Sequence, residues 1–298
     1  MDPLALTDRA RAAQDKARVL REALPWITRS AGRTIVVKYG GNAMAGDPLT
    51  AAFAADVALL RSVGLRTVVV HGGGPQISAL GERLGLRARF VDGRRVTDSD
   101  TLEVVKMALL GQVNPRLVGL IAAEGAPAVG VSGVSAAMVT ARPAGDGLGH
   151  VGEVDRVDPR ILNTLLDDGA VPVVATVARG REGGEYNVNA DTMAGAIAVA
   201  LAADKLIYLT NVPGLYDAFG TDRSTLLSEV TVERLRAMLA AGELHTGMAP
   251  KVRSIVEALD GGVARAHLLD GRVEHALLLE IFTDEGIGTM VVPDGTGR

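Results

Sequence analysis

Two glycine-rich turns, the first of them opened by a lysine, are the residues of this chain best suited to bind an anion. The turn 38–41 (Lys-Tyr-Gly-Gly) follows the predicted strand 34–37, and the turn 71–74 (His-Gly-Gly-Gly) follows the predicted strand 67–70. Because glycine has no Cβ, backbone N–H groups in such turns can approach a phosphate closely. A helix after each turn would point its positive end at the same place. We therefore predict a polyphosphate site made largely of backbone, to which Lys38 adds a full charge.

Other known uses of glycine-rich turns find less support. The sequence has no Gly-x-x-x-x-Gly-Lys-Ser/Thr, which excludes a Walker-type site, and no Gly-x-Gly-x-x-Gly follows a predicted strand, which disfavours a dinucleotide site. His-Gly-Gly-Gly also forms the oxyanion loop of some esterases, but these need a Gly-x-Ser-x-Gly elbow that the sequence lacks. A hydrolase therefore ranks below a phosphotransferase, and His71 is assigned no role.

Four features further along the chain could complete such a site, and each also has an ordinary structural explanation. Residues 187–191 (Asn-Val-Asn-Ala-Asp) precede an apolar helix and hold more polar groups than helix capping needs. Lys251 lies near a predicted helix start, where the helix dipole disfavours a cation; it either meets an anion or is solvated. Arg95 either grips a carboxylate with its planar guanidinium or lies on the surface. The loop 210–214 (Thr-Asn-Val-Pro-Gly) is either near a nucleotide or a plain Pro-Gly turn.

Composition narrows the class of protein. The chain has 298 residues, of which 48% are hydrophobic and 22% charged, with a net charge of −4. That length suits one large α/β unit or two lobes, and the absence of a basic stretch argues against nucleic acid as a partner. With no cysteine, disulfides and thiolate metal sites are excluded, and no metal site is predicted. No apolar run long enough to span a bilayer is evident, so we expect no membrane partner and a cytoplasmic location.

Strand and helix signals alternate from Thr34 onward, which predicts an α/β fold with a mainly parallel open sheet sandwiched by helices. Ligands of such sheets bind at the carboxyl ends of the strands, where both glycine turns lie. A helix is predicted to start near Asp100 and to break near Gly111 and Pro115. The segment 138–156 is typical of hairpins near a sheet edge, and the polar, glycine-rich stretch 179–185 is predicted to separate two lobes. The other helices are predicted over 49–63, 76–84, 190–202, 232–240 and 252–259, and the other strands over 126–131, 171–177, 205–209 and 264–268.

The first 30 residues are predicted to form a separate helical arm. Apolar residues recur there at steps of four and three, which places them on one narrow stripe that should end at Pro25. The stripe either packs on its own domain or, being as thin as a coiled-coil seam, pairs with another subunit. Acidic residues within the arm argue against an organelle transit peptide. The stripe residues are Leu6, Ala10, Ala13, Ala17, Leu20 and Leu24.

Taken together, these motifs resemble the amino acid kinase family, in particular its branch that acts on N-acetyl-L-glutamate. The resemblance covers about 34–292 and rests on stretches that occur in the family's order. As a set they are specific, although each alone is not. The stretches are 38–44, 70–75, 95–97, 187–191 and the Gly-Met-x-x-Lys of 247–251.

The resemblance implies transfer of a phosphoryl group from ATP, with Mg²⁺ carried by the nucleotide, to the side-chain carboxylate of N-acetyl-L-glutamate, a step toward arginine. It implies that Lys38 and Lys251 stabilise the phosphoryl group in flight and that Asp191 holds both lysines. Lobe 31–178 would bind the acetylated amino acid and lobe 179–298 the nucleotide. The amino acid would lie on Gly73, Gly74, Arg95 and Asn187, and the nucleotide on Gly40, Gly41, Thr210, Asn211 and Gly214. Gly41 and Gly73 would also give their N–H groups to the phosphates.

The arm and a C-terminal stretch at 280–289 resemble those of arginine-inhibited hexamers within the same family. This implies an arginine site near His267, Glu280 and Gly286, and a homo-oligomer, a hexamer of dimers linked by the N-terminal helices. A PII-type signalling protein is a further candidate partner. Two alternatives stay open: another amino acid kinase, acting on carbamate, glutamate or aspartate, and a non-catalytic nucleotide-binding regulator.

Overall fold

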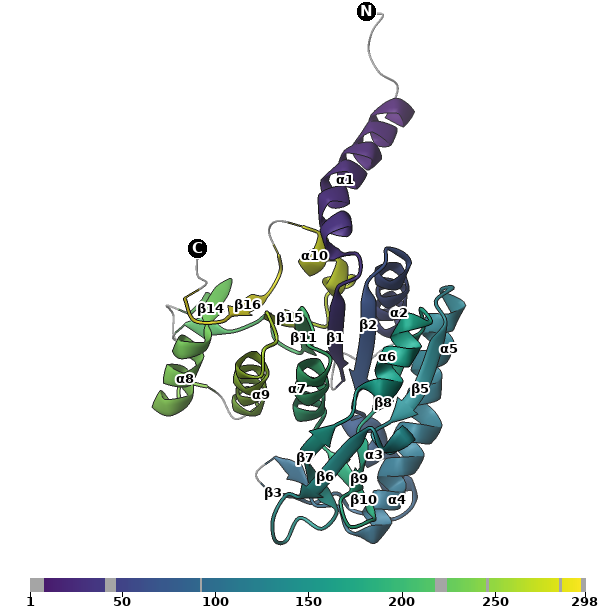
Figure 1. The fold of residues 1–298 in the computed structure, drawn as a ribbon, viewed down its shortest axis with the longest axis vertical. Helices are drawn as coiled ribbons and strands as arrows, with labels where there is room; N and C mark the ends of the chain where they lie inside the picture. Colours follow the sequence, from purple (N-terminus) through teal and green to yellow (C-terminus); the bar gives the residue numbers. More distant parts are fainter. Residues whose placement is uncertain are drawn as a thin grey trace, which may run out of the picture.

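A computed structural model describes residues 8–40, 47–91, 93–217, 224–244, 247–283 and 286–295. Its centre is an eight-stranded sheet in the order β14-β16-β15-β11-β1-β2-β8-β5, with helices on both faces (Figure 1). Neighbouring strands are parallel except for β15 and β16. The predicted fold class is thereby confirmed. The strands are β1 Thr34–Tyr39, β2 Arg66–His71, β5 Ala128–Ser132, β8 Val171–Ala175, β11 Lys205–Thr210, β14 Glu229–Thr231, β15 Ala266–Asp270 and β16 Thr289–Val292.

The sheet divides the hydrophobic core in two, because successive side chains of a strand point to opposite faces. Val36 and Val68 pack with helices α6 to α9 on one face. Ile35 and Val69 pack with α2, α5 and α10 on the other. Both faces are therefore closed to water, and the carboxyl edge of the sheet remains as the place for a ligand. The helices are α2 Asp47–Ser62, α3 Gly74–Arg83, α4 Ser99–Ala108, α5 Asn114–Ala123, α6 Arg160–Asp167, α7 Ala190–Ala200, α8 Val232–Ala241, α9 Ala249–Asp260 and α10 Ala276–Phe282.

A second, four-stranded sheet closes on itself beside the carboxyl edge of the main one. The predicted hairpins of 138–156 exist as β6 Val139–Pro143 and β7 Val151–Val157, but they lie in this separate sheet rather than at an edge of the main sheet. The stretch 179–185 joins β9 Val177–Gly180 to β10 Glu185–Val188 as a hairpin turn. The division into lobes stays a prediction. Two short hairpins complete the strands: β3 Phe90–Val91 with β4 Arg94–Arg95, and β12 Tyr216–Asp217 with β13 Thr225–Leu226.

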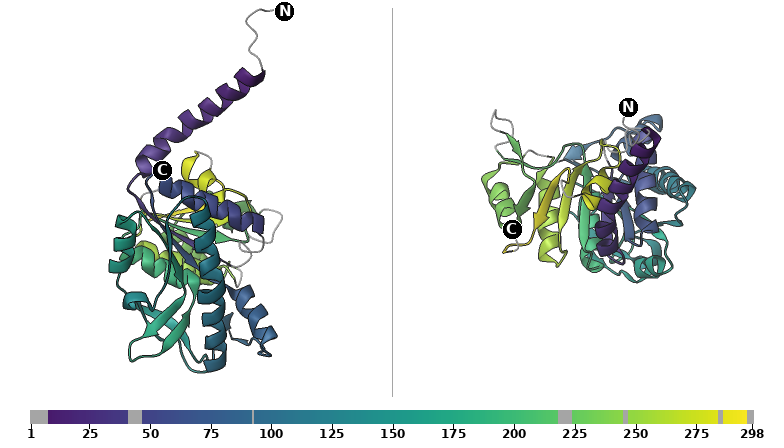
Figure 2. Two further views of the ribbon diagram at one scale, coloured as in Figure 1. Left: turned by 90° about the vertical axis from the view of Figure 1, so that its right-hand side faces the viewer. Right: turned by 90° about the horizontal axis from the view of Figure 1, so that it is seen from above.

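The N-terminal helix α1, Asp8–Ser30, projects away from the body of the molecule (Figures 1 and 2). The prediction that it ends at Pro25 is wrong, because the helix runs through the proline to Ser30. Trp26 and Ile27 pack on the core beside α10, which holds the last turn in place. The Thr28 hydroxyl also donates to the Leu24 carbonyl, at 2.9 Å. Packing of the final turn therefore outweighs the loss of one backbone hydrogen bond.

Helices α4 and α5 are joined by a π-helical segment, Leu109–Val113, so the helix is widened there and not broken near Gly111 as predicted. The start of α4 is capped by Asp98, whose side chain accepts a hydrogen bond from the Thr101 N–H. The stretch Ser99–Ala123 is long and apolar enough to meet the criterion for a membrane span, although 44% of its most apolar 18-residue window is buried. Core helices of soluble proteins pass the same test, and here Val105 and Leu117 pack inside.

Candidate active site

A single carboxylate pairs with two lysines at the carboxyl edge of the sheet. Asp191 Oδ1 lies 3.1 Å from Lys38 Nζ, and Asp191 Oδ2 accepts a hydrogen bond from Lys251 Nζ at 2.6 Å. Lys38 comes from β1, Asp191 from the start of α7 and Lys251 from the first turn of α9. Three residues far apart in the sequence thus form one buried charged group, as the resemblance implies for the catalytic centre.

The local sequence explains how Asp191 is held. The side chain of Asn189 caps α7 by accepting from the N–H groups of Asp191 and Thr192. The carbonyl of Asp191 accepts from the hydroxyls of Ser254 and Tyr208, at 2.8 Å and 3.2 Å. Ser254 stands on α9, one turn after Lys251, so the same helix fixes both the backbone and the side chain of Asp191.

Burial and charge act against each other in this group. Burial is the largest influence on Lys38 and lowers its pKa, although the charge of Asp191 opposes it. Burial alone would raise the pKa of Asp191, but the two ammonium groups outweigh it and hold the pKa below its usual value. An ionised aspartate between two cations leaves one net positive charge at the site. Such a charge suits an anionic ligand.

The two glycine turns meet beside Lys38. A Cβ on Gly40 would lie 3.4 Å from the Gly72 nitrogen and 3.5 Å from Lys38 Nζ, so the turns and the ammonium group share one small space. A Cβ on Gly73 would lie 2.6 Å from a methyl of Leu109, which leaves no room for a side chain there. Gly41 lies outside the described residues. The two turns therefore come together at Gly40 and Gly72, and the phosphate cradle that they would form stays a prediction.

The four residues predicted to bind the amino acid lie in one connected cluster. Arg95 donates to the Gly74 carbonyl at 3.2 Å and to the Ser78 hydroxyl at 2.7 Å. Asn187 donates to the Thr97 hydroxyl at 3.2 Å, and that hydroxyl donates in turn to the Arg95 carbonyl. Burial lowers the pKa of the Arg95 guanidinium, which nevertheless keeps its charge at neutral pH. This cluster joins β4, β10 and the second glycine turn.

Three of the residues predicted for the nucleotide, Thr210, Asn211 and Gly214, lie at the end of β11 and in the loop after it. Thr210 turns its hydroxyl onto the Val212 carbonyl at 2.7 Å, while Asn211 is exposed. Gly214 lines a mainly apolar pocket together with Leu215, Tyr216, Glu243, Leu244 and Met248. A Cβ on Gly214 would lie 2.4 Å from the Thr289 hydroxyl oxygen, so only glycine lets the loop pass β16.

The three residues predicted to bind arginine also lie together. His267 Nδ1 lies 2.7 Å from Glu280 Oε1, and a Cβ on Gly286 would lie 3.2 Å from Glu280 Oε2. Burial, the largest influence, lowers the pKa of His267, and it alone would raise that of Glu280. The contacts with His267 nevertheless hold the pKa of Glu280 below its usual value. His267 lies on β15, Glu280 on α10 and Gly286 beyond the end of α10.

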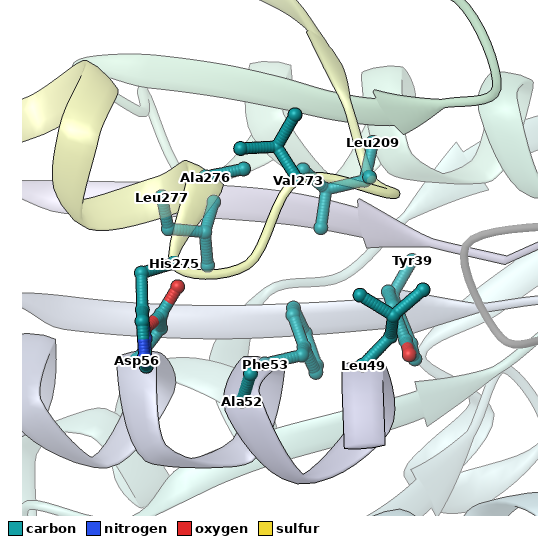
Figure 3. Close-up of a pocket in the computed structure, with 11 residues that line it drawn as sticks. Tyr39, Leu49, Ala52, Phe53, Asp56, Leu209, Val273, His275, Ala276 and Leu277 are labelled. Carbon is teal, nitrogen blue, oxygen red and sulfur yellow. The ribbon is translucent and has the colours of Figure 1, made fainter. Parts of the chain in front are cut away.

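Another pocket lies on the opposite face of the sheet from α7 and α9 (Figure 3). It is lined mainly by apolar side chains of α2 and of the turn before α10, and by Tyr39, whose ring stacks on Phe53 with centroids 3.9 Å apart. His275 Nδ1 lies 2.6 Å from Asp56 Oδ1 at its margin. Among the described residues, none of those predicted to bind or react lines this pocket.

Sequence reasoning missed the residues that support Asp191 from behind. The hydroxyl oxygens of Tyr208 and Ser254 lie 2.9 Å apart, and each lies within hydrogen-bonding distance of the Asp191 carbonyl. A tyrosine in an apolar strand and a serine in an amphipathic helix have no distinctive spacing. The one available signal is that Ser254 follows Lys251 by three residues, which places both on the same helix face.

Comparison with known proteins agrees with this geometry. A model of the amino acid kinase family matches residues 33–270. The chain therefore belongs to the amino acid kinase family. Within it, its relatives include the acetylglutamate kinase of Frankia alni, 54% identical over 97% of this chain and 86% of the relative. That of Symbiobacterium thermophilum is 50% identical over 94% of this chain and 98% of the relative.

Solved structures add a more distant likeness. N-acetylglutamate synthase from Neisseria gonorrhoeae, complexed with coenzyme A and N-acetyl-glutamate, superposes with a TM-score of 0.81 at 28% identity. The match covers 93% of this chain but only 63% of the synthase chain. The same synthase complexed with coenzyme A and L-arginine gives a TM-score of 0.78. Carbamate kinase from Giardia lamblia bound to AMP-PNP, at 19% identity and a TM-score of 0.66, shares the fold.

Proposed function

We propose that this protein transfers the γ-phosphoryl group of ATP to the side-chain carboxylate of N-acetyl-L-glutamate. The observation that carries the proposal is the Lys38–Asp191–Lys251 group, set beside two glycine turns at the carboxyl edge of the sheet. Relatives named acetylglutamate kinase, at 50–54% identity over nearly the whole chain, support the choice of substrate. The N-acetyl-glutamate complex of the related synthase supports it further.

The chemistry asks little of the protein beyond positioning and charge. The attacking carboxylate has a reference pKa near 4.3, so it is ionised at neutral pH and needs no general base. What slows the reaction is repulsion between two anions and the charge that gathers on the transferred group. Lys38 and Lys251 offset that charge, Asp191 keeps both ammonium groups in place, and the glycine N–H groups receive phosphate oxygens.

The two substrates would enter from opposite sides of the lysines. Arg95 would bind a carboxylate of N-acetyl-L-glutamate, with Asn187, Gly73 and Gly74 beside it. The nucleotide would follow the loop of Thr210, Asn211 and Gly214, with its base in the apolar pocket next to Met248. Lys38 and Lys251 already engage Asp191, so Mg²⁺ would be held mainly by phosphate oxygens and water.

A substrate panel tests the proposal. ADP release is measured with N-acetyl-L-glutamate, glutamate, aspartate and carbamate offered separately, with and without Mg²⁺. We expect turnover with N-acetyl-L-glutamate to exceed that with the other acceptors by at least about 100-fold, since a site built to pair a polar group rejects acceptors that lack it. Preference for another acceptor would instead identify a different amino acid kinase. ATP binding without turnover of any acceptor would indicate a nucleotide-binding regulator.

We further propose that arginine inhibits the enzyme by binding at His267, Glu280 and Gly286. The carboxylate of Glu280 would offset the charge of the ligand, and the L-arginine complex of the related synthase supports an arginine site in this fold. The arm α1 contacts α10, which carries Glu280, and would link dimers into a hexamer in the cytoplasm. A PII-type partner stays a prediction from the family resemblance.

A further inference from the structure

His71 and Asn114 form a buried chain of hydrogen bonds that ends on the second glycine turn. Asn114 Nδ2 donates to the Val173 carbonyl at 2.8 Å and lies 2.9 Å from His71 Nε2. His71 Nδ1 lies 3.0 Å from the carbonyl oxygen of Gly72. Both residues are buried: His71 is 0% exposed and Asn114 is 7% exposed. The mechanism proposed above uses neither of them.

The direction of this chain follows from its two ends. The Val173 carbonyl can only accept, so the atom of Asn114 that faces it is the amide nitrogen, and its second hydrogen points to His71 Nε2. Burial lowers the pKa of His71 to about 4, so the ring is neutral at pH 7 and carries one N–H. Because Nε2 accepts, Nδ1 is protonated and donates to the Gly72 carbonyl.

The contact that holds the Gly72 carbonyl also sets the direction of the N–H of the next residue, Gly73. The described chain has no cis peptide bond, and in a planar trans peptide the C=O and the following N–H point in opposite directions. With the Gly72 carbonyl turned toward His71 in the interior, the Gly73 N–H is turned away from it. Gly73 is one of the two glycines from which the family resemblance implies a donor to the phosphates.

The surrounding chain makes room for this arrangement. A Cβ on Gly130 would lie 2.0 Å from Asn114 Oδ1, so the neighbouring strand must carry glycine where the amide passes. Asn114 directly follows the π-helical segment, and Leu109 and Val113 of that segment pack against the backbone of Gly73. Segments with π-helical geometry occur frequently at functional sites. The helix thus supports the turn at two successive residues, Gly72 and Gly73.

We propose that Asn114 and His71 are positioning residues that fix the Gly72–Gly73 peptide so that its N–H receives the transferred phosphoryl group. This inference rests on the proposed kinase function. It assigns neither residue a direct contact with substrate. Their effect is expected on the transition state, where a preorganised donor matters most, and less on ground-state binding of either substrate.

Replacing His71 by asparagine or by leucine, two side chains of nearly equal size, separates a positioning role of His71 from a packing role. His71→Asn keeps a side-chain N–H near the place of Nδ1, whereas His71→Leu offers none. We expect His71→Leu and Asn114→Leu to lower kcat about 100-fold, the loss typical of one misplaced donor, with both KM values within about threefold of wild type. His71→Asn should recover kcat to within about tenfold. Ile121→Ala, a buried change on the same helix α5, is the control for lost stability.

The inference would be overturned if kcat fell equally in His71→Asn and His71→Leu. It would also be overturned if the kcat values of the two leucine variants matched that of Ile121→Ala. If His71→Leu does not fold, His71→Gln is used in its place. The amide of the glutamine side chain reaches Asn114 but not the Gly72 carbonyl. A readout independent of activity is the ¹⁵N spectrum of histidine-labelled protein, with the His71 signal assigned by its absence in His71→Asn. We expect the Nδ1–H form; an Nε2–H form would refute the chain of hydrogen bonds even if the wild type turned over no acceptor. A wild type that shows the Nδ1–H form but no turnover would instead refute the kinase function.

Discussion

Lys251 Nζ lies 2.6 Å from Asp191 Oδ2, although Lys251 stands in the first turn of a helix, where the dipole disfavours a cation. Asp191 stands in the first turn of α7, where the dipole favours an anion. The carboxylate of Asp191 thus suits the positive end of its own helix and also offsets the unfavourable charge of Lys251 at the start of α9. The pair is anchored before any ligand arrives, which is the preorganisation that electrostatic catalysis requires.

Removing either lysine should affect turnover far more than nucleotide affinity. We expect Lys38→Ala and Lys251→Ala to lower kcat about 10² to 10³-fold, because each ammonium group offsets charge that develops in the transition state. The dissociation constant of a non-hydrolysable ATP analogue should change much less. The measurements are steady-state kinetics and calorimetric titration, with Lys16→Ala on the exposed arm as the control. Near-normal turnover in both variants would contradict these roles.

Replacing Asp191 should move the pH dependence of the enzyme as well as its rate. Burial lowers the pKa of Lys38, and the charge of Asp191 opposes that effect. In Asp191→Asn the opposing charge is gone, so the pKa of Lys38 falls further and the ammonium form is lost at a lower pH. The alkaline limb of the kcat/KM profile should therefore shift to lower pH.

Asp204→Asn provides the matched control for that profile. Asp204 is also a carboxylate next to a strand end and pairs with Arg33 at 2.7 Å, but it lies at the opposite edge of the sheet, before β11. Its profile should superimpose on that of the wild type. An unshifted alkaline limb in Asp191→Asn would show that Lys38 does not depend on Asp191 for its charge.

The Lys38–Asp191–Lys251 group also shows what the sequence could and could not predict. The strand-turn-helix order placed Lys38 and both glycine turns at one edge, because parallel strands end on the same side. The pairing of Asp191 with two lysines came only from family resemblance, since no local pattern encodes a contact between β1, α7 and α9. Asn114 was missed for the same reason. At Pro25 and Gly111 the sequence predicted the end of a helix, but the helix continues there. Tertiary packing overrode the local preference of these residues to end a helix.

Deleting residues 1–24 should abolish both assembly and arginine inhibition. Val19, Leu20 and Leu24 are 58–68% exposed on α1, which is costly for an isolated chain and consistent with burial against another subunit. Trp26 and Ile27 stay on the core, so the catalytic body should keep its turnover. Light scattering gives the mass, and ADP release with added arginine gives the inhibition.

A full-length variant separates loss of the helix from loss of its large exposed apolar side chains. Replacing Val19, Leu20 and Leu24 together by serine keeps the length of α1, and we expect it to act like the deletion. Inhibition that survives in the deleted protein would sink the proposed link between the arm and arginine. A hexamer that survives in the serine variant would assign assembly to other residues.

The pair His275–Asp56 should make stability depend on pH. The hydrogen bond from His275 to Asp56 raises the pKa of that histidine, while burial raises the pKa of Asp56. A histidine with a raised folded pKa contributes stability that is complete below its unfolded value of about 6.5 and is lost as pH rises through the folded value. The raised pKa of Asp56 acts in the same direction, because the folded state then holds its proton more tightly.

The test compares Tm for the wild type and His275→Gln between pH 6 and pH 9. We expect the wild type to be more stable by a few degrees at pH 6 and the difference to shrink toward pH 9. The size stays modest because the His275 side chain is 51% exposed and water screens its charge. His150→Gln is the control, since that ring faces the Ser99 hydroxyl rather than a carboxylate. A difference in Tm that is constant across this range would show that His275 is held by packing and not by its charge.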